Sequence, residues 1–326
     1  MTIEALNQRV GGERGKGGGW PKNLTYEATD GPAVVTVKIS NPGTTKEDVF
    51  KRIDPWGLAF FDEVKQCTGK PMQLIFDIKV PSTPKAQLQY EALKRRVSYL
   101  ASANNLHVTL LRNKLADALY SMDDLAKRPD REKIRDVINQ HGDNDKPGRL
   151  EKDFQAYLYG KGLFNSPDTV IRRTNARLAL FGDDFVRIGK FKTGNHCKGY
   201  KVEREFPTGA FCDEIKEHAR ILPTEFIDLV TINRDGDVAV IELKFDDPKL
   251  EVIPQVLNYS LFFHSYRSQL TGLLDKHLEC STRDANLVTY LVSNTFHPRF
   301  ASVWHYYSRG PLKMKQVIMG YMPDQG

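Results

Sequence analysis

The chain has few cysteines, and their placement excludes the sites that cysteines usually build. There are four in 326 residues, and no two of them form a CxxC pair: Cys67, Cys197, Cys212 and Cys280. Structural zinc sites and disulfide frameworks need cysteines at short, regular spacings. We therefore expect four reduced cysteines that hold no metal.

Long apolar runs are also missing. No segment approaches the roughly 20 apolar residues that a membrane-spanning helix requires. The start of the chain, MTIEALNQRVGGERGKGGGW, lacks the apolar core of a signal peptide. With 40% hydrophobic and 27% charged residues, the composition is that of a globular protein. We expect a cytoplasmic protein with no membrane partner.

Glycine is scarce where a nucleotide-binding loop would need it. The turn after the first expected strand reads NPGTT (41–45) and does not resemble a P-loop. Glycine is concentrated instead in the first 22 residues, beside several basic side chains, so we interpret residues 1–22 as a flexible basic arm. A net charge of +6 permits a nucleic-acid partner without establishing one.

Residues 23–140 predict a small α/β domain. Strands are expected at 34–39, 72–80 and 107–113, and helices at 45–67 (with a break at Pro55), 83–105, 114–128 and 130–140. Thr83 is the expected N-cap of the second helix, and Pro84 its first residue. Alternating strands and helices favour a largely parallel sheet. No motif in residues 23–140 indicates a particular reaction, so we expect this domain to serve in sensing or partner binding.

The polar, turn-forming sequence HGDNDKPG (141–148) predicts a linker over residues 141–149. A second α/β domain is then expected over residues 150–326. Its first element is an amphipathic helix with Leu150, Phe154, Tyr157 and Leu158 on one face.

The central motif of this second half is a predicted β-hairpin. FIDLVTI and VAVIELK read as two strands joined by the turn RDGD, with Asp228 in the first strand and Glu242 and Lys244 at the end of the second. Because side chains alternate along a strand, Glu242 and Lys244 point the same way. A solvent-facing ExK pair on an edge strand is common. Two carboxylates and a lysine on a hairpin otherwise suited to burial favour a functional interpretation.

These residue types suit metal-assisted hydrolysis. An Asp and a Glu supply the hard oxygen ligands that Mg²⁺ prefers. The bound ion activates a water and shields phosphate oxygens. A neighbouring lysine can stabilise the charge that develops at phosphorus.

The whole segment resembles the PD-(D/E)xK (restriction-endonuclease-like) nuclease superfamily. That pattern combines an acid on a first helix, a strand Asp, an ExK on the return strand, and a following helix with Gln and often Tyr. Here these are Glu151, Asp228, Glu242-Leu243-Lys244, Gln255 and Tyr259. The form is similar to mismatch endonucleases of archaea and actinobacteria, Holliday-junction resolvases, Mrr-like enzymes and Shedu-like phage-defence nucleases. The nominal Pro is displaced, since Pro223 stands five residues before Asp228.

The resemblance implies a role for each residue. Asp228 and Glu242 hold Mg²⁺, for which Mn²⁺ can substitute, together with the carbonyl of Leu243. Lys244 positions the attacking water, Glu151 reaches a second metal or orients that water, and Gln255 orders the edge of the site. Asp153 competes with Glu151 for its role, and Tyr259 is expected to serve packing.

The resemblance also implies a mixed sheet flanked by helices. Further strands are expected at 200–211, 286–294 and 313–322, with a helix at 297–309. The basic loop 189–201 predicts contacts with a nucleic-acid backbone through Lys190, Lys192, Lys198 and Lys201.

The expected function is a Mg²⁺-dependent DNA endonuclease in repair, restriction or phage defence, with DNA favoured over RNA. Cutting both strands takes two active sites, so a homo-oligomer is expected. The alternative is a non-catalytic nucleic-acid-binding or assembly module that retains the fold.

Overall fold

The protein is an α/β structure built on two mixed five-stranded sheets. The computed structural model describes residues 2–13, 19–29, 34–39, 49–69, 72–127, 132–134, 151, 155, 176–179, 203–208, 210–212, 214, 216, 220, 222, 226–233, 235–318 and 320–323. Within these residues no helix has the length and apolar character needed to cross a membrane.

The first sheet has the order β1-β2-β3-β4-β5, with a parallel centre and antiparallel edges. Its strands are β1 (Leu24–Thr29), β2 (Val34–Ile39), β3 (Gln73–Ile78), β4 (His107–Arg112) and β5 (Leu115–Asp117). Its helices are α1 (Ile3–Glu13), α2 (Ile53–Thr68), α3 (Pro84–Asn104) and α4 (Met122–Leu125), with a 3-10 turn at Val49–Lys51. The predicted parallel centre is confirmed, whereas strand β1 was not predicted.

Local residues explain where the helices begin and end. The Thr83 hydroxyl accepts a hydrogen bond from the Ala86 amide at 3.4 Å, and Pro84 is the first helical residue of α3, as predicted. Helix α2 begins at Ile53, so Pro55 lies in its first turn, where proline is tolerated. The expected break lies at Arg52, between the 3-10 turn and α2, instead of at Pro55 itself.

Three predictions for the first half are wrong. Residues 114–128 form β5 and α4 instead of one helix, because Asn113 and Lys114 take positive φ in a tight turn and Ser121 caps a new helix. A helix was expected at 130–140, but residues 132–134 form strand β6 (Glu132–Ile134), which pairs with β9 (Ala210–Cys212). The expected flexible arm contains the helix α1, whose apolar residues recur at helical spacing and are buried: Ile3, Leu6 and Val10.

The second sheet has the order β13-β12-β11-β10-β8. Its strands are β8 (Glu203–Pro207), β10 (Phe226–Ile232), β11 (Val238–Lys244), β12 (Leu287–Ser293) and β13 (Lys313–Ile318). Strands β11, β12 and β13 run parallel, and β10 is antiparallel to both of its neighbours. Its helices are α6 (Val252–Ser265), α7 (Arg267–Leu278) and α8 (Phe300–Tyr307). The predicted hairpin, mixed sheet and C-terminal helix are confirmed.

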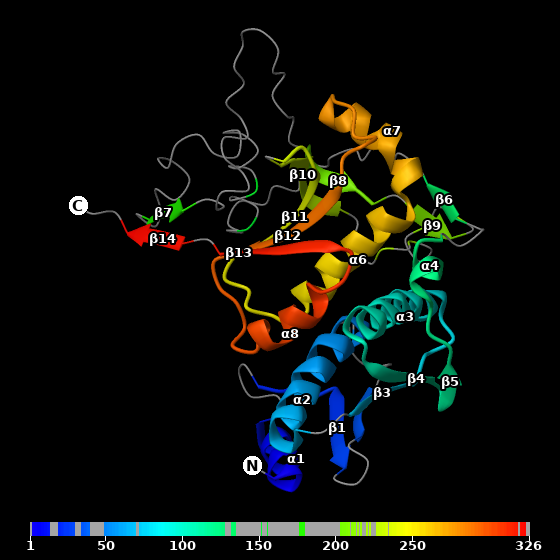
Figure 1. Cartoon of the computed structure of the whole chain (residues 1–326), viewed down its shortest axis with the longest axis vertical. Helices are drawn as coiled ribbons and strands as arrows, with labels where there is room; N and C mark the ends of the chain where they lie inside the picture. The colour runs from blue at the N-terminus through cyan, green and yellow to red at the C-terminus, as the bar shows by residue number, and fades with distance from the viewer. Residues whose placement is uncertain are drawn as a thin grey trace.

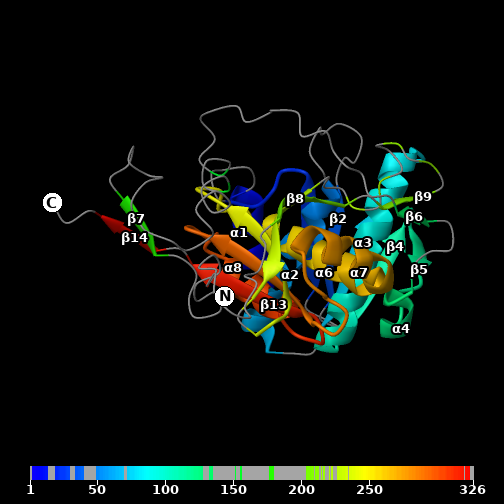
Figure 2. The same cartoon turned by 90° about the horizontal axis from the view of Figure 1, so that it is seen from above.

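Two small strand pairs are separate from the five-stranded sheets. Strand β9 (Ala210–Cys212) pairs with β6, and β7 (Ala176–Ala179) pairs with β14 (Gly320–Pro323). In both views the β7–β14 pair lies well apart from the main body (Figures 1 and 2).

The two sheets share a hydrophobic core instead of having separate ones. Figure 1 shows the first sheet at the bottom, then α2 and α3, then α8 and α6, and the second sheet above. One cluster of buried residues includes Val37 and Phe60 of the first half together with Val256, Leu257 and Val303 of the second. The expectation of two independently packed domains is therefore corrected, while the proposed boundary at 141–149 lies outside the described residues.

Helix α6 faces two cores at once. Val256 and Leu257 belong to the cluster shared with the first sheet, whereas Tyr259, Phe262 and Phe263 pack in a second cluster with β10, β11 and α7. Helix α6 therefore packs on one side against the first half of the chain and on the other against the strands of the predicted hairpin.

Candidate functional site

The hairpin turn brings β10 and β11 into the register that the site requires. The Asn233 side chain accepts hydrogen bonds from the amides of Asp235 (3.0 Å) and Asp237 (2.9 Å), and Gly236 takes a positive φ of 84°. Leu229 then pairs with Ile241, so the next position along each strand holds Asp228 and Glu242. The sequence of the turn therefore brings the two acids together.

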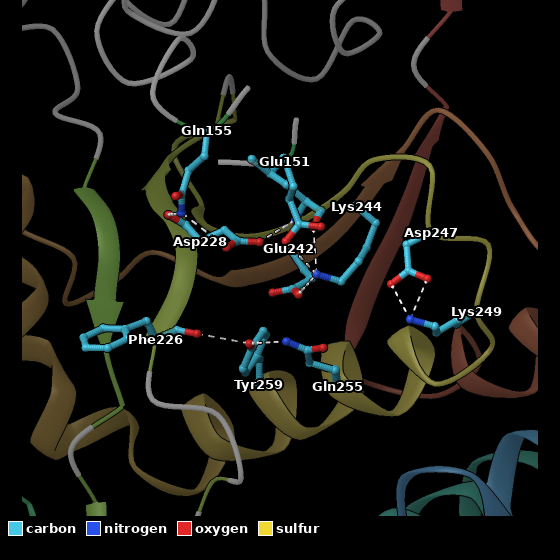
Figure 3. Close-up of polar contacts among 11 residues, drawn as sticks. Glu151, Gln155, Phe226, Asp228, Glu242, Lys244, Asp247, Lys249, Gln255 and Tyr259 are labelled. Atoms are coloured by element: carbon cyan, nitrogen blue, oxygen red, sulfur yellow. Dashed lines mark hydrogen bonds and ion pairs between the residues drawn. The ribbon is translucent and has the colours of Figure 1, made fainter. Parts of the chain in front are cut away.

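Asp228 is held by two elements besides its own strand. One carboxylate oxygen, Oδ2, accepts the main-chain N–H of Leu243 at 2.8 Å. The other, Oδ1, accepts the side-chain amide of Gln155 at 3.2 Å, and the same amide donates to the Asp228 carbonyl at 2.9 Å. The carboxylate is thus fixed between the return strand and Gln155 (Figure 3).

Lys244 lies at the centre of the cluster. Its ammonium is 2.8 Å from a Glu242 oxygen and 3.2 Å from a Glu151 oxygen, and it donates to the Leu243 carbonyl at 3.0 Å. The Glu242 side chain is only 2% exposed and that of Lys244 16%. Figure 3 shows Glu151, Asp228, Glu242 and Lys244 converging on one region. These four predicted residues are brought together.

The charges of the cluster are not balanced. Burial lowers the pKa of the Lys244 ammonium, but the carboxylates of Glu242, Asp228 and Glu151 outweigh it and raise this pKa above the usual 10.5. Burial raises the pKa of the Glu151 carboxyl; Lys244 lowers it, Asp228 raises it again, and the net direction is upward. Among the residues that the structure describes, one lysine therefore faces three carboxylates.

Gln255 and Tyr259 lie on α6 as predicted, and Tyr259 links Gln255 to the start of β10. The Gln255 amide donates to the Tyr259 hydroxyl at 2.8 Å, and that hydroxyl lies 3.3 Å from the Phe226 carbonyl. Tyr259 is fully buried, in agreement with its expected packing role. The pair supports the strand that carries Asp228, two residues beyond Phe226.

Gln155 and Arg204 are members of the site that the sequence did not identify. Both Glu151 and Gln155 have helical backbone and stand one turn apart, so they share a face. That spacing is the one signal in the sequence that could have indicated Gln155. Asp153, the competitor of Glu151, lies outside the described residues, as do Lys190, Lys192, Lys198 and Lys201 of the predicted basic loop.

The donor set fits a hard divalent cation by its chemistry. Asp228, Glu242 and the Leu243 carbonyl offer only oxygen atoms, which Mg²⁺ and Mn²⁺ prefer. Among the residues that the structure describes, no three His, Cys, Asp or Glu side chains are already arranged as metal ligands. The ammonium of Lys244 lies among these oxygens, so the site already holds one positive charge there.

Comparisons of the chain with protein-family models, with curated proteins and with solved structures yield no match. The case for a function therefore depends on the residues of this site alone.

Proposed function

We propose that the chain is a Mg²⁺-dependent endonuclease that hydrolyses phosphodiester bonds of DNA, with Mn²⁺ able to replace Mg²⁺. The supporting observation is the arrangement of three carboxylates and one lysine at the end of the hairpin strands. A buried cluster in which one lysine meets three carboxylates of the described residues favours binding of a further cation. A bound metal would activate water and shield phosphate oxygens.

Each side chain has a distinct role in this proposal. Asp228, Glu242 and the Leu243 carbonyl would hold the metal. Lys244, whose raised pKa keeps it protonated at neutral pH, would stabilise negative charge at the phosphorus centre. Glu151, which already contacts Lys244, would orient the attacking water or a second ion.

The proposed reaction is used in several biological settings. Repair, restriction and phage defence all use metal-dependent DNA cleavage, and the first half of the chain would sense a substrate, a nucleotide or a partner. A homo-oligomer would supply the two active sites needed to cut both strands.

The test is to incubate the purified full chain with single-stranded, double-stranded and branched DNA and with RNA. Parallel reactions contain Mg²⁺, Mn²⁺ or EDTA. We expect DNA cleavage with either metal, no cleavage in EDTA, and none for Asp228→Asn with either metal. Asp123→Asn, which makes the same change at an exposed position on α4, is the matched control and should cleave like the parent.

Cleavage that persists in EDTA would contradict the metal-dependent mechanism. DNA binding without cleavage under every metal condition would instead indicate the non-catalytic module. Preferential cleavage of RNA would correct the substrate.

A further inference from the structure

We propose that Gln155 is a positioning residue that sets the Asp228 carboxylate for cation binding, and that Arg204 fixes the orientation of the Gln155 amide. This inference rests on the proposed function, because it concerns how the same site prepares a metal ligand. It is carried by three hydrogen bonds that join Gln155 to two neighbouring strands.

The environment of Gln155 is unusual for an amide side chain. The residue is only 1% exposed, so its donors and acceptor must find partners inside the protein. Its Nε2 donates to the Asp228 main-chain carbonyl (2.9 Å) and to the Asp228 Oδ1 atom (3.2 Å). One amide nitrogen thus binds both the backbone and the side chain of the same residue, which fixes their relative orientation.

Arg204 determines which end of the amide faces Asp228. Its Nε donates to Gln155 Oε1 at 3.2 Å, from strand β8, where Arg204 pairs with Leu229 of β10. A flipped amide would place a nitrogen against the guanidinium and an oxygen against the carboxylate. Both contacts would be repulsive, so Arg204 keeps the donor directed at Asp228.

The result is a carboxylate whose plane is set from two sides. Leu243 donates to Oδ2 and Gln155 donates to Oδ1, so both oxygens are held. Each carboxylate oxygen has two acceptor positions, and each of these two bonds occupies one of them. Both donors are neutral and add no positive charge that would compete with a metal ion. Hydrogen-bonded partners of this kind typically change metal affinity by about 10–100-fold when removed.

The experiment measures Mn²⁺ binding to the full chain by isothermal titration calorimetry, a readout that does not depend on cleavage. The variants are Gln155→Met, Arg204→Met and the matched control Gln73→Met. Gln73 donates a single amide hydrogen bond to Thr109 (2.8 Å) in the first sheet, away from the site. Thermal unfolding of each variant is measured in parallel.

We expect Gln155→Met to raise the Mn²⁺ dissociation constant about 10–100-fold. Arg204→Met should raise it by a smaller factor, because the amide remains but loses its fixed orientation, and Gln73→Met should leave it unchanged. DNA cleavage by Gln155→Met should recover at high Mn²⁺ concentration, since the defect lies in ligand positioning.

Other results overturn the inference in distinguishable ways. If the parent binds and cleaves with Mn²⁺ while Gln155→Met and Arg204→Met bind it equally well, the positioning role is wrong and the proposed function stands. If cleavage by Gln155→Met stays low at saturating Mn²⁺, the role is not positioning of a ligand. If the parent binds no Mn²⁺, the proposed function fails as well. Should Gln155→Met not fold, Arg204→Met alone decides in the same way.

Discussion

Two buried clusters of charge lie among the residues that the structure describes, and they differ in how their charges are matched. In the first, between the two sheets, Arg96 donates to both carboxylate oxygens of Asp54 (2.8 and 2.9 Å). Arg96 also donates to Asn258 (3.1 Å) and to the Phe50 carbonyl (2.6 Å), and the Tyr307 hydroxyl donates to Asp54 at 2.7 Å. One cation faces one anion, and Asn258, the Phe50 carbonyl and the Tyr307 hydroxyl are neutral partners.

The second cluster, at the end of the hairpin, has one cation for three anions. Lys244 contacts Glu242 and Glu151, and Asp228 lies close enough to raise the lysine's pKa. Burial of ions is costly unless their charges are matched. The Arg96 cluster meets this condition within the protein, whereas the Lys244 cluster would meet it on binding a further cation. The comparison supports a structural role for the first cluster and, under the proposed function, a chemical role for the second.

The largest effect is expected from Lys244→Met. Removing the ammonium deletes a group that acts on charge developing during hydrolysis, so the cleavage rate should fall about 10²–10³-fold. DNA affinity should change little, because it depends on many phosphate contacts. Rates come from gel assays with Mg²⁺ and affinities from fluorescence anisotropy in Ca²⁺. Lys249→Met is the control, since Lys249 is 65% exposed and pairs with Asp247. Equal cleavage by the two variants would remove the chemical role from the second cluster.

Arg96→Met should instead act on stability. It leaves the fully buried Asp54 carboxylate without its cation, which typically costs about 3–5 kcal/mol in unfolding free energy. Urea denaturation measures the change. Lys94→Met on the same helix breaks a less deeply buried pair with Asp117 and should cost less than Arg96→Met. Mg²⁺ should not restore the stability of Arg96→Met. A loss no larger than that of Lys94→Met would contradict the structural role.

The smallest effect concerns Glu151 and pH. The pKa of the Glu151 carboxyl is raised above the usual 4.5 in the folded protein. Its favourable contribution to the free energy of unfolding is therefore present below pH 4.5 and is lost as the pH rises through the folded pKa. Without metal, Glu151→Gln should therefore be more stable than the parent at pH 7, and the difference should disappear near pH 4. The side chain is 33% exposed, so screening keeps the gain under about 1 kcal/mol.

Thermal unfolding between pH 4 and pH 8 in EDTA checks this expectation. Glu214→Gln, at another partly exposed acid, is the control for a general charge effect. A parent that is more stable than Glu151→Gln at pH 7 would show that the bond from Glu151 to Lys244 outweighs the excess negative charge.

The core of the site could be predicted because it depends on local geometry. Alternation along β11 places Glu242 beside Lys244, and the turn between the strands places Asp228 opposite them. Gln155 could not be assigned a role, because its partner lies 73 residues further along the chain. Helical spacing shows that Gln155 shares a face with Glu151 and does not show which strand that face meets.

The shared core was missed although α6 carried a signal for it. In VIPQVLNYSLFFHS apolar residues surround the helix on nearly every side, and such a helix is buried between two layers. The buried Arg96 gave no comparable signal, since charged residues on a helix are usually exposed. Tertiary pairing with Asp54, which also accepts a hydrogen bond from Tyr307, explains its burial, and Asp54 lies 42 residues before Arg96 in the sequence.

The shared core also has a consequence for the order in which the protein folds. Asp54 and Tyr307 are 253 residues apart, and Tyr99 bonds to the Arg309 carbonyl across 210 residues. At translation rates of about 5–20 residues per second, roughly 10–50 s pass between synthesis of Asp54 and of its partner. During that time the surfaces of α2 and α3 that α8 will cover remain open to solvent or to chaperones. A nascent chain stalled before α8 would leave these faces of α2 and α3 uncovered, so the shared core is completed only after α8 has been synthesised.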